Sequence, residues 1–328
     1  MDLSARREIL PLIRAARRIL IIAHVDPDGD AIGSLLALGH ALRSLGKRVV
    51  LASADPVPAE YRFLPGSEVV TAYPAGEFQI LISVDCSDIQ RMGTAYRPAA
   101  FAHRPFINID HHATNVNFGS VNWVDSTAAS TAEMVFSLIE EMAVPITSDI
   151  ALCLLTGVVT DTRCFRTSST TARTMATATR LMEAGASLPV ITEQVLNRRP
   201  LAAIRLWAEA LTSIQLRNRV IWTEITQAML ERSGVQGNGV LGGLSNFLVS
   251  AHEADVAVVF TEKRGGSVEV GFRSVPGIDV SRVAFQLGGG GHPQASGCTI
   301  QGTMEEARER VLTFLNLSLS TQRGARQL

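Results

Sequence analysis

The sequence predicts an α/β protein that has an N-terminal parallel sheet with flanking helices and a smaller C-terminal α/β domain. Two patterns favour the parallel sheet: strand-like apolar runs alternate with helix-like segments, and several of these runs end in aspartate or histidine. The third observation is size. A chain of 328 residues is longer than one hydrophobic core usually serves, so we expect two domains.

Apolar periodicity predicts the individual elements of the N-terminal part. The strand candidates are residues 18–24, 47–54, 78–87 and 105–112. The helix candidates are residues 31–46, 130–142, 147–161 and 171–186. Charges among apolar residues at helical spacing also indicate a helix within the first 20 residues, where a signal peptide would have an unbroken apolar core.

The pattern changes near residue 191, where a connecting helical segment begins. Strand-like runs follow at 219–225, 255–263 and 267–274, and a short helix at 279–287 leads into a glycine run and His292. We therefore expect one domain at 1–190, a helical linker at 191–212 and a second domain at 213–328.

Composition limits the classes of protein to consider. The 46% hydrophobic and 19% charged residues are ordinary for a globular protein. A net charge of -1 argues against a long nucleic-acid track, which needs a basic excess. No apolar run reaches the roughly 20 residues of a membrane span. The four cysteines are scattered without a C-x-x-C pair, which favours reduced thiols and a cytoplasmic location.

Four groups of chemistry-bearing residues follow apolar segments. They are His24 to Asp30, Asp85, Asp110-His111-His112 and Asp161. The carboxyl ends of parallel strands share one edge of a sheet, so these side chains are expected to converge. Converging carboxylates repel one another unless cations neutralise them. Carboxylate and imidazole ligands suit Mn²⁺ or Mg²⁺.

Each group has a less specific interpretation when it is taken alone. The stretch DPDGD is also typical of a solvated turn, and a lone Asp85 at a strand end is often a helix cap. A calcium loop is excluded, because Ala31 and Ala37 occupy its obligatory glycine and glutamate positions. The sequence lacks a G-x-S-x-G nucleophile elbow. The occurrence of all four groups in this order favours a metal centre.

These motifs resemble those of the DHH phosphoesterases. HVDPDGDAIGS, VDCSD, IDHH and VVTDTRCFR match the four motifs of that family in order, and GFRS and GGGGHPQASG match its DHH-associated second domain. The resemblance covers nearly the whole chain. It is strongest to the NrnA-type subgroup of bifunctional oligoribonucleases and 3′-phosphoadenosine 5′-phosphate (pAp) phosphatases. The first domain would then be the DHH catalytic domain and the second the DHH-associated substrate-binding domain.

The resemblance implies two Mn²⁺ ions, for which Mg²⁺ or Co²⁺ could substitute. The implied metal ligands are His24, Asp28, Asp30, Asp85, His111 and Asp161, with Asp85 bridging the two ions. The implied catalytic residues are Asp85, Asp110 and His112, with Asp110 orienting a histidine, His112 facing the phosphate, and Asp26 in support. Arg163 stands where relatives commonly have glycine, which puts the turn after Asp161 in question.

The resemblance also implies the residues that bind substrate. They are Arg273, Ser274, Gly288, Gly289, Gly290, Gly291 and His292. Glycines let backbone N–H groups approach a phosphate without interference from side chains. An arginine can hold a phosphate through two parallel hydrogen bonds.

The resemblance therefore implies a phosphoesterase in which metal-activated water releases 5′-mononucleotides from short oligonucleotides and converts pAp to AMP. The expected partners are short RNA or DNA oligonucleotides and pAp; no membrane partner is expected, and a homodimer is compatible with the sequence. Two alternatives within the superfamily are a RecJ-like single-strand exonuclease and a manganese inorganic pyrophosphatase, although the basic motif of the latter is not seen. An inactive nucleotide sensor is the alternative outside enzymes.

Overall fold

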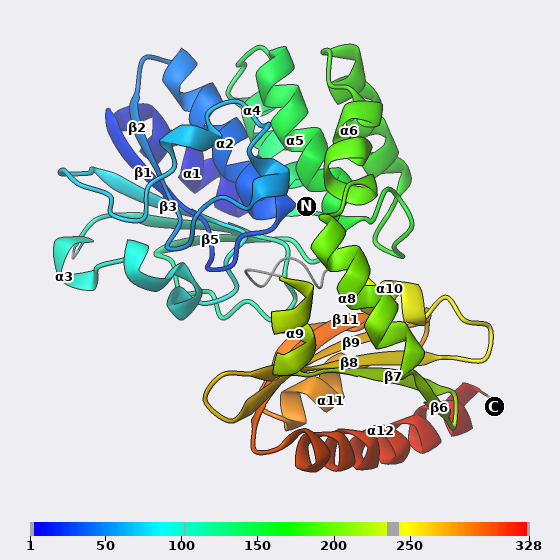
Figure 1. Ribbon diagram of the computed structural model, residues 1–328. Coiled ribbons are helices and arrows are strands. Elements are labelled where there is room, and N and C mark those ends of the chain that lie inside the picture. Colours follow the sequence, from blue (N-terminus) through cyan, green and yellow to red (C-terminus); the bar gives the residue numbers. More distant parts are fainter. Residues whose placement is uncertain (1–2, 102, 235–242, 327–328) are drawn as a thin grey trace. The chain divides into compact units, whose positions relative to one another are not determined.

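The computed structural model describes residues 3–101, 103–234 and 243–326 (Figure 1). The chain divides into two compact units, Met1–Arg198 and Arg199–Leu328. No helix within the described ranges has both the length and the apolar character that a membrane crossing requires.

A five-stranded parallel sheet with the strand order β2-β1-β3-β4-β5 forms the centre of the first unit. Its strands are β1 (Arg18–Ile22), β2 (Arg48–Ala52), β3 (Ile80–Val84), β4 (Phe106–Asp110) and β5 (Val121–Val124). The first four confirm the strands expected from the apolar runs. The sequence does not predict β5, because its four residues, VNWV, include only one buried side chain, that of Trp123.

The helices of the first unit confirm those expected at 31–46, 130–142, 147–161 and 171–186, now seen as α2, α4, α5 and α6. The bounds are α1 (Leu3–Ala15), α2 (Gly29–Ser44), α3 (Pro98–Phe101), α4 (Thr131–Glu141), α5 (Ser148–Asp161), α6 (Ala172–Glu183) and α7 (Leu188–Thr192). Shorter turns are the 3₁₀ segments η1 (Ala59–Tyr61), η2 (Ser67–Val69) and η3 (Ile89–Ala95) and the π turn η4 (Glu193–Asn197).

The sheet is buried on both faces. Ile19 and Ile21 of β1 belong to the core that α1, α2, α4 and α5 share on one face (Figure 1). Leu20 and Ile22 belong to a second core on the other face, together with side chains of η3 and α3. Burial on both faces explains why the strand sequences are continuous apolar runs.

Helices α2 and α5 approach each other closely because each has a glycine at the contact. A Cβ atom on Gly33 would lie 2.4 Å from the carbonyl oxygen of Cys153. One on Gly157 would lie 2.6 Å from the Cβ of Ala132 and 2.8 Å from Oδ1 of Asp30. The contact holds the start of α2 against α5 and against the N-terminus of α4.

The second unit has a six-stranded sheet with the order β10-β11-β9-β8-β7-β6. Its strands are β6 (Gln215–Arg217), β7 (Val220–Ile225), β8 (Val256–Lys263), β9 (Ser267–Ser274), β10 (Gly290–His292) and β11 (Ala295–Gln301). All neighbours are antiparallel except β7 and β8. Helices α11 (Ser281–Gln286) and α12 (Met304–Arg326) share one core with the sheet, and α8 (Leu201–Thr212), α9 (Gln227–Ser233) and α10 (Leu244–Leu248) share the other.

The structure differs from the sequence-based expectation in several parts of this unit. The glycine run contributes two residues to the edge strand β10, a strand that the sequence patterns do not predict. Helix α12, which the sequence patterns above do not predict, extends as far as Arg326. The segment expected as a helical connection is helical, with α7 and η4 in the first unit and α8, preceded by Pro200, in the second. The linker bounds 191 and 212 stay predictions.

We expect Gly33→Ala to lower the free energy of unfolding by about 1–3 kcal/mol, because its methyl group would meet a backbone carbonyl that cannot rotate away. Gly39→Ala in the same helix is the matched control. Its methyl group would meet only the side-chain end of Leu51, at 2.8 Å, and alanine favours a helix over glycine by about 1 kcal/mol. Urea unfolding measures both. Equal free energies for the two variants would contradict the close approach of α2 and α5.

Candidate metal centre

The candidate metal ligands of the first unit lie at the carboxyl ends of its central strands. His24 follows β1, Asp85 follows β3, and Asp110 ends β4. His111 and His112 come directly after Asp110. Strands β1 and β3 are neighbours, and the chain continues from them to opposite sides of the sheet. In open α/β sheets, ligands bind outside the strand ends at such a reversal.

Asp85 lies at the centre of the cluster and is 1% exposed. One carboxylate oxygen, Oδ2, is 3.4 Å from Nε2 of His24. The other, Oδ1, is 3.7 Å from Nε2 of His111 and 3.6 Å from Nδ1 of His112. The hydroxyl of Thr131 donates to the same Oδ1 at 2.9 Å. Asp85 thus contacts three histidines, which suits a ligand shared by two ions.

Asp30 is held by the N-terminus of α4. The backbone N–H of Thr131 donates to Oδ2 at 2.6 Å, and that of Ala132 donates to Oδ1 at 2.8 Å. The Ser34 hydroxyl lies 3.4 Å from Oδ1. The first N–H groups of a helix lack partners within the helix and carry partial positive charge, so they stabilise and orient this buried carboxylate.

Asp161, the last residue of α5, brings a further carboxylate to the cluster. Its Oδ2 lies 3.6 Å from Nε2 of His111. The same nitrogen lies 3.9 Å from Oδ2 of Asp30. Carboxylates from α2, from α5 and from the residue after β3 therefore surround the ring of His111.

Two groups of donor atoms made up entirely of the candidate metal ligands have spacings compatible with metal ions. In each group the atoms lie within 4.8 Å of one another. One group is His24, Asp28 and Asp85, and the other is Asp30, Asp85 and His111. They share Asp85, and their carboxylate and imidazole donors suit divalent cations. The residues therefore fit divalent-cation binding, with Asp85 common to both groups.

Burial and mutual repulsion strongly perturb these carboxyl groups. Burial and the charges of Asp85, Asp161 and Asp28 raise the pKa of Asp30 well above its usual range. Burial and the neighbouring aspartates raise the pKa of Asp161 to about 6, although His111 opposes the shift. Burial would also raise the pKa of Asp85, but the hydrogen bond with His24 and the nearby histidines lower it instead. The cluster thus holds more negative charge than its own histidines can balance.

His112 is positioned by Asp110 instead of by the cluster. Its Nδ1 donates to Oδ1 of Asp110 at 2.7 Å. Asn115 donates to the other oxygen of Asp110 at 2.5 Å and to the carbonyl of Cys86 at 3.0 Å. Burial lowers the pKa of His112, but the hydrogen bond and the charges of nearby aspartates outweigh burial and raise it to about 9. The ring therefore carries a proton at neutral pH.

Sequence reasoning missed three residues that position the cluster. They are Thr131, Asn115 and Arg91. Nη2 of Arg91 lies 3.1 Å from Nδ1 of His24, which is also 2.6 Å from the carbonyl oxygen of Val25. Thr131 follows the Ser130 cap of α4, and this Ser-Thr pair was the only sequence signal available for any of the three.

The other two aspartates of the DPDGD stretch, Asp28 and Asp26, differ from each other in their contacts. Asp28 caps α2, and its Oδ1 accepts from the backbone N–H groups of Asp30 and Ala31 at 3.0 Å each. The same oxygen lies 3.9 Å from Nε2 of His24. Asp26 is exposed, has a φ of 49°, and its N–H donates to Asp55. Its supporting role stays a prediction.

In the second unit, Arg273 and His292 project from one face of the sheet. Arg273 pairs with Ala295, and Ala295 pairs with His292. Side chains of directly opposed residues in antiparallel strands point to the same face. The Nε of Arg273 donates to the side chain of Asn246 at 2.8 Å. Ser274 is buried, and its hydroxyl donates to the carbonyl of Ile278 at 2.6 Å.

The glycine run has a specific conformational requirement at two positions. Gly288 and Gly291 have φ values of 84° and 134°, which residues with a side chain rarely adopt. At Gly289, an added Cβ would lie 2.0 Å from the carbonyl oxygen of Gly297. The space around Gly290 is open, so the backbone of this first residue of β10 is accessible. A role of the run in binding substrate stays a prediction.

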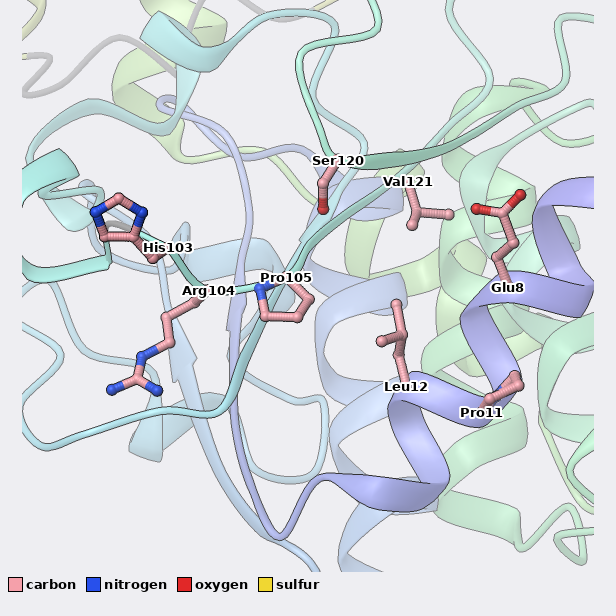
Figure 2. A pocket seen from close by; sticks show the side chains of 8 residues that line it. All are labelled: Glu8, Pro11, Leu12, His103, Arg104, Pro105, Ser120 and Val121. Atoms are coloured by element: carbon pink, nitrogen blue, oxygen red, sulfur yellow. The ribbon is translucent and has the colours of Figure 1, made fainter.

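In the first unit, a hollow of about 580 Å³ lies away from the candidate metal ligands, beside the starts of β4 and β5 (Figure 2). Its lining residues are Glu8, Pro11, Leu12, His103, Arg104, Pro105, Ser120 and Val121. Asp110 and the two histidines that follow it lie at the opposite end of β4. The hollow is therefore separate from the candidate metal centre.

Comparisons with known proteins match both units. The family described as "DHH family, N-terminal domain" matches residues 18–158, and the "DHHA1 domain" matches residues 228–321. These ranges include most of the residues that sequence analysis singled out. Asp161 lies just beyond the first range.

Similar proteins cover nearly the whole chain. A Thermus thermophilus protein named bifunctional oligoribonuclease and PAP phosphatase NrnA is 37% identical, over 92% of this chain and 90% of its own. A Bacillus subtilis protein of the same name is 27% identical, over 94% and 97%. An exopolyphosphatase-related protein from Bacteroides fragilis has a TM-score of 0.91 and 25% identity, covering 98% of this chain and 99% of its own.

We expect Asp85→Asn to remove most of the stabilisation that a divalent metal gives the protein. One ion at a thousand times its Kd adds about 4 kcal/mol to the free energy of unfolding, and Asp85 belongs to both donor groups. Asp26→Asn is the matched control, since both aspartates have positive φ, which asparagine tolerates. Thermal unfolding with and without Mn²⁺ measures the gain. Similar metal-dependent gains in both variants would contradict the bridging position.

We expect the metal-free protein to lose stability as the pH rises from about 6.5 to about 9. The pKa of His112 is 6.5 in its ordinary state and about 9 in the fold, so the folded state binds more protons in this window. The full contribution is about 3 kcal/mol. His112→Gln lacks this contribution, so its free energy of unfolding should fall by about 3 kcal/mol less over the same pH range. Urea unfolding at pH 6, 7.5 and 9 measures the difference. Parallel pH profiles of the two proteins would contradict the raised pKa.

Proposed function

The chain belongs to the DHH family of phosphoesterases, and we propose that it hydrolyses short oligonucleotides to 5′-mononucleotides and dephosphorylates pAp to AMP. The observation that carries this proposal is similarity over nine-tenths of the chain to a relative named for both activities. The geometry of the first unit supports it, since a cluster of carboxylates and histidines suits phosphoryl chemistry.

We propose that the resident metal is a pair of Mn²⁺ ions, for which Mg²⁺ or Co²⁺ could substitute. His24, Asp28 and Asp85 would hold one ion. The ligands of the other would be Asp30, Asp85, His111 and Asp161. When bound there, divalent ions would supply a water of lowered pKa for attack on phosphorus and positive charge for the phosphate oxygens.

The side chains around the cluster would prepare it for this chemistry. Thr131 fixes the rotamer of Asp85 through its hydroxyl and that of Asp30 through its N–H. Asp110 keeps the ring of His112 in one orientation and protonated. A protonated imidazole can donate a hydrogen bond to a phosphate oxygen, and it can supply a proton to the departing oxygen.

In the second unit, Arg273, His292 and the glycines from Gly288 to Gly291 would hold a phosphate of the substrate. The guanidinium and the imidazole lie on one face, two strands apart. Arginine suits paired hydrogen bonds to phosphate. Ser274 would support the end of β9, because its hydroxyl already bonds to Ile278.

Charge favours short substrates. The chain has 30 basic and 31 acidic residues, whereas a long single strand would need many cations along a groove. Each neutralised phosphate of a single strand contributes about -0.7 to the salt slope of binding. A compact grip on one or two phosphates should therefore give a shallow slope and a preference for substrates of a few nucleotides.

We expect RNAs of about two to five nucleotides to be cleaved faster than strands of about twenty, with pAp converted to AMP by the same protein and a shallow salt dependence. Chromatography of the products from 5′-labelled RNAs and from pAp, with Mn²⁺ present, measures this. Asp85→Asn is the control for contaminating nucleases.

Other outcomes would redirect the assignment. Faster digestion of the long strand with a steep salt slope would favour an exonuclease for long single strands. Hydrolysis of pyrophosphate alone would favour a pyrophosphatase. Tight binding of pAp without turnover in the presence of Mn²⁺ would favour a nucleotide sensor.

A further inference from the structure

The backbone directly after Asp161 adopts an unusual conformation. Arg163, Cys164 and Phe165 have φ values of 49°, 58° and 63°, so three consecutive residues with side chains lie in the left-handed region. For an L-residue this region costs roughly 1–2 kcal/mol per residue. Such outliers occur at sites where function requires them.

The turn is held by groups other than the Arg163 side chain. Buried Thr162 donates its hydroxyl to the carbonyl of Val158 at 2.6 Å and accepts from the N–H of Phe165 at 3.0 Å. The N–H of Cys164 donates to the carbonyl of Val159 at 2.7 Å. Cys164 and Phe165 also pack against the core of the first unit.

The Arg163 side chain has no comparable structural role. It is half-buried, and within the described ranges its guanidinium makes neither a hydrogen bond nor an ion pair. Its five N–H donors are therefore partly removed from water without protein acceptors, which is unfavourable. Glycine would adopt the same backbone conformation without strain. The arginine thus requires an explanation outside the turn.

A second guanidinium lies on the same turn. Nε of Arg166 donates to the carbonyl of Arg163 at 2.9 Å, which folds this exposed side chain back over the turn. Burial and the charge of Arg166 lower the pKa of Arg163, whereas Asp161 raises it. Two cations therefore lie close together directly beside a candidate metal ligand.

We infer that Arg163 and Arg166 form an anion subsite beside the metal centre that binds a phosphate of the substrate other than the one hydrolysed. The inference rests on the proposed function and adds a specificity determinant to it. Both proposed substrates carry such a phosphate: pAp has two phosphate groups, and a 5′-phosphorylated dinucleotide has one besides its linkage. An anion held there would satisfy donors that lack partners within the described residues.

The competing explanation is that Arg163 only balances the charge of Asp161. Arg163→Gly separates the two, because it removes the guanidinium and relieves the backbone strain. Cys164→Gly is the matched control, since it relaxes the same turn (φ 58°) and leaves both arginines in place. Arg163→Lys keeps the charge but loses the paired donors.

Three measurements test the subsite. Hydrolysis of pAp is compared with that of bis(p-nitrophenyl) phosphate, which has a single phosphate. Calorimetric titration gives the Kd of pAp for the metal-free protein, and a second titration gives the Kd of Mn²⁺. For Arg163→Gly we expect kcat/KM on pAp to fall about 10- to 100-fold, the range of a hydrogen bond to a charged group, with a comparable rise in the Kd of pAp. Hydrolysis of the single-phosphate diester and the Kd of Mn²⁺ should not change.

The two other variants serve as controls, and two alternative results would overturn the subsite. Arg163→Lys should recover part of the loss, and Cys164→Gly should match the wild type on both substrates. Equal losses on both substrates, or a weaker Kd for Mn²⁺ with pAp binding unchanged, would overturn the subsite in favour of charge balance. A wild-type protein that hydrolyses neither substrate would refute the proposed function instead, and the pAp titration would still decide whether Arg163 binds a phosphate.

Discussion

The burial of two neighbouring carboxylates, those of Asp30 and Asp85, is the constraint on which the first unit depends. Each is 1% exposed, and burying like charges side by side is unfavourable without compensation. Thr131 contacts both, with its N–H on Asp30 and its hydroxyl on Asp85. The N-terminus of α4 can reach this point because Gly157 leaves room beside Asp30 and Ala132. The packing of α2, α4 and α5 therefore serves the charges as well as the hydrophobic core.

The sequence was sufficient to predict the sheet and the clustering of its ligands, for a topological reason. Strands buried on both faces are continuous apolar runs, and residues that follow such runs meet at one edge, as His24, Asp85 and Asp110 do. The partners that orient these ligands could not be predicted in the same way. Thr131 and Asp30 are separated by 101 positions, and Asn115 reaches Asp110 from a loop. Neither contact leaves a periodic signal in the sequence.

The second unit was harder to predict because its edges lack apolar alternation. All three residues of β6 are exposed, and β10 consists of two glycines and a histidine. Their strand conformation comes from pairing with neighbours and not from local propensity. Helix α12 is different, because its sequence carried a usable signal. Ala307, Val311, Leu315 and Leu319 recur every four residues and are all buried, a spacing typical of one helical face.

The distribution of the candidate ligands along the chain, from His24 to Asp161, has a consequence for biosynthesis. A nascent chain emerges from the ribosome N-terminus first, so the early histidine and aspartates leave the ribosome well before the last carboxylate. The local stretch from His24 to Asp30 supplies only part of either donor group. A metal held by these groups would therefore not nucleate folding, in contrast to a zinc finger whose ligands lie close together in sequence. Incorporation of the ions would instead be a late event that marks completion of the first unit.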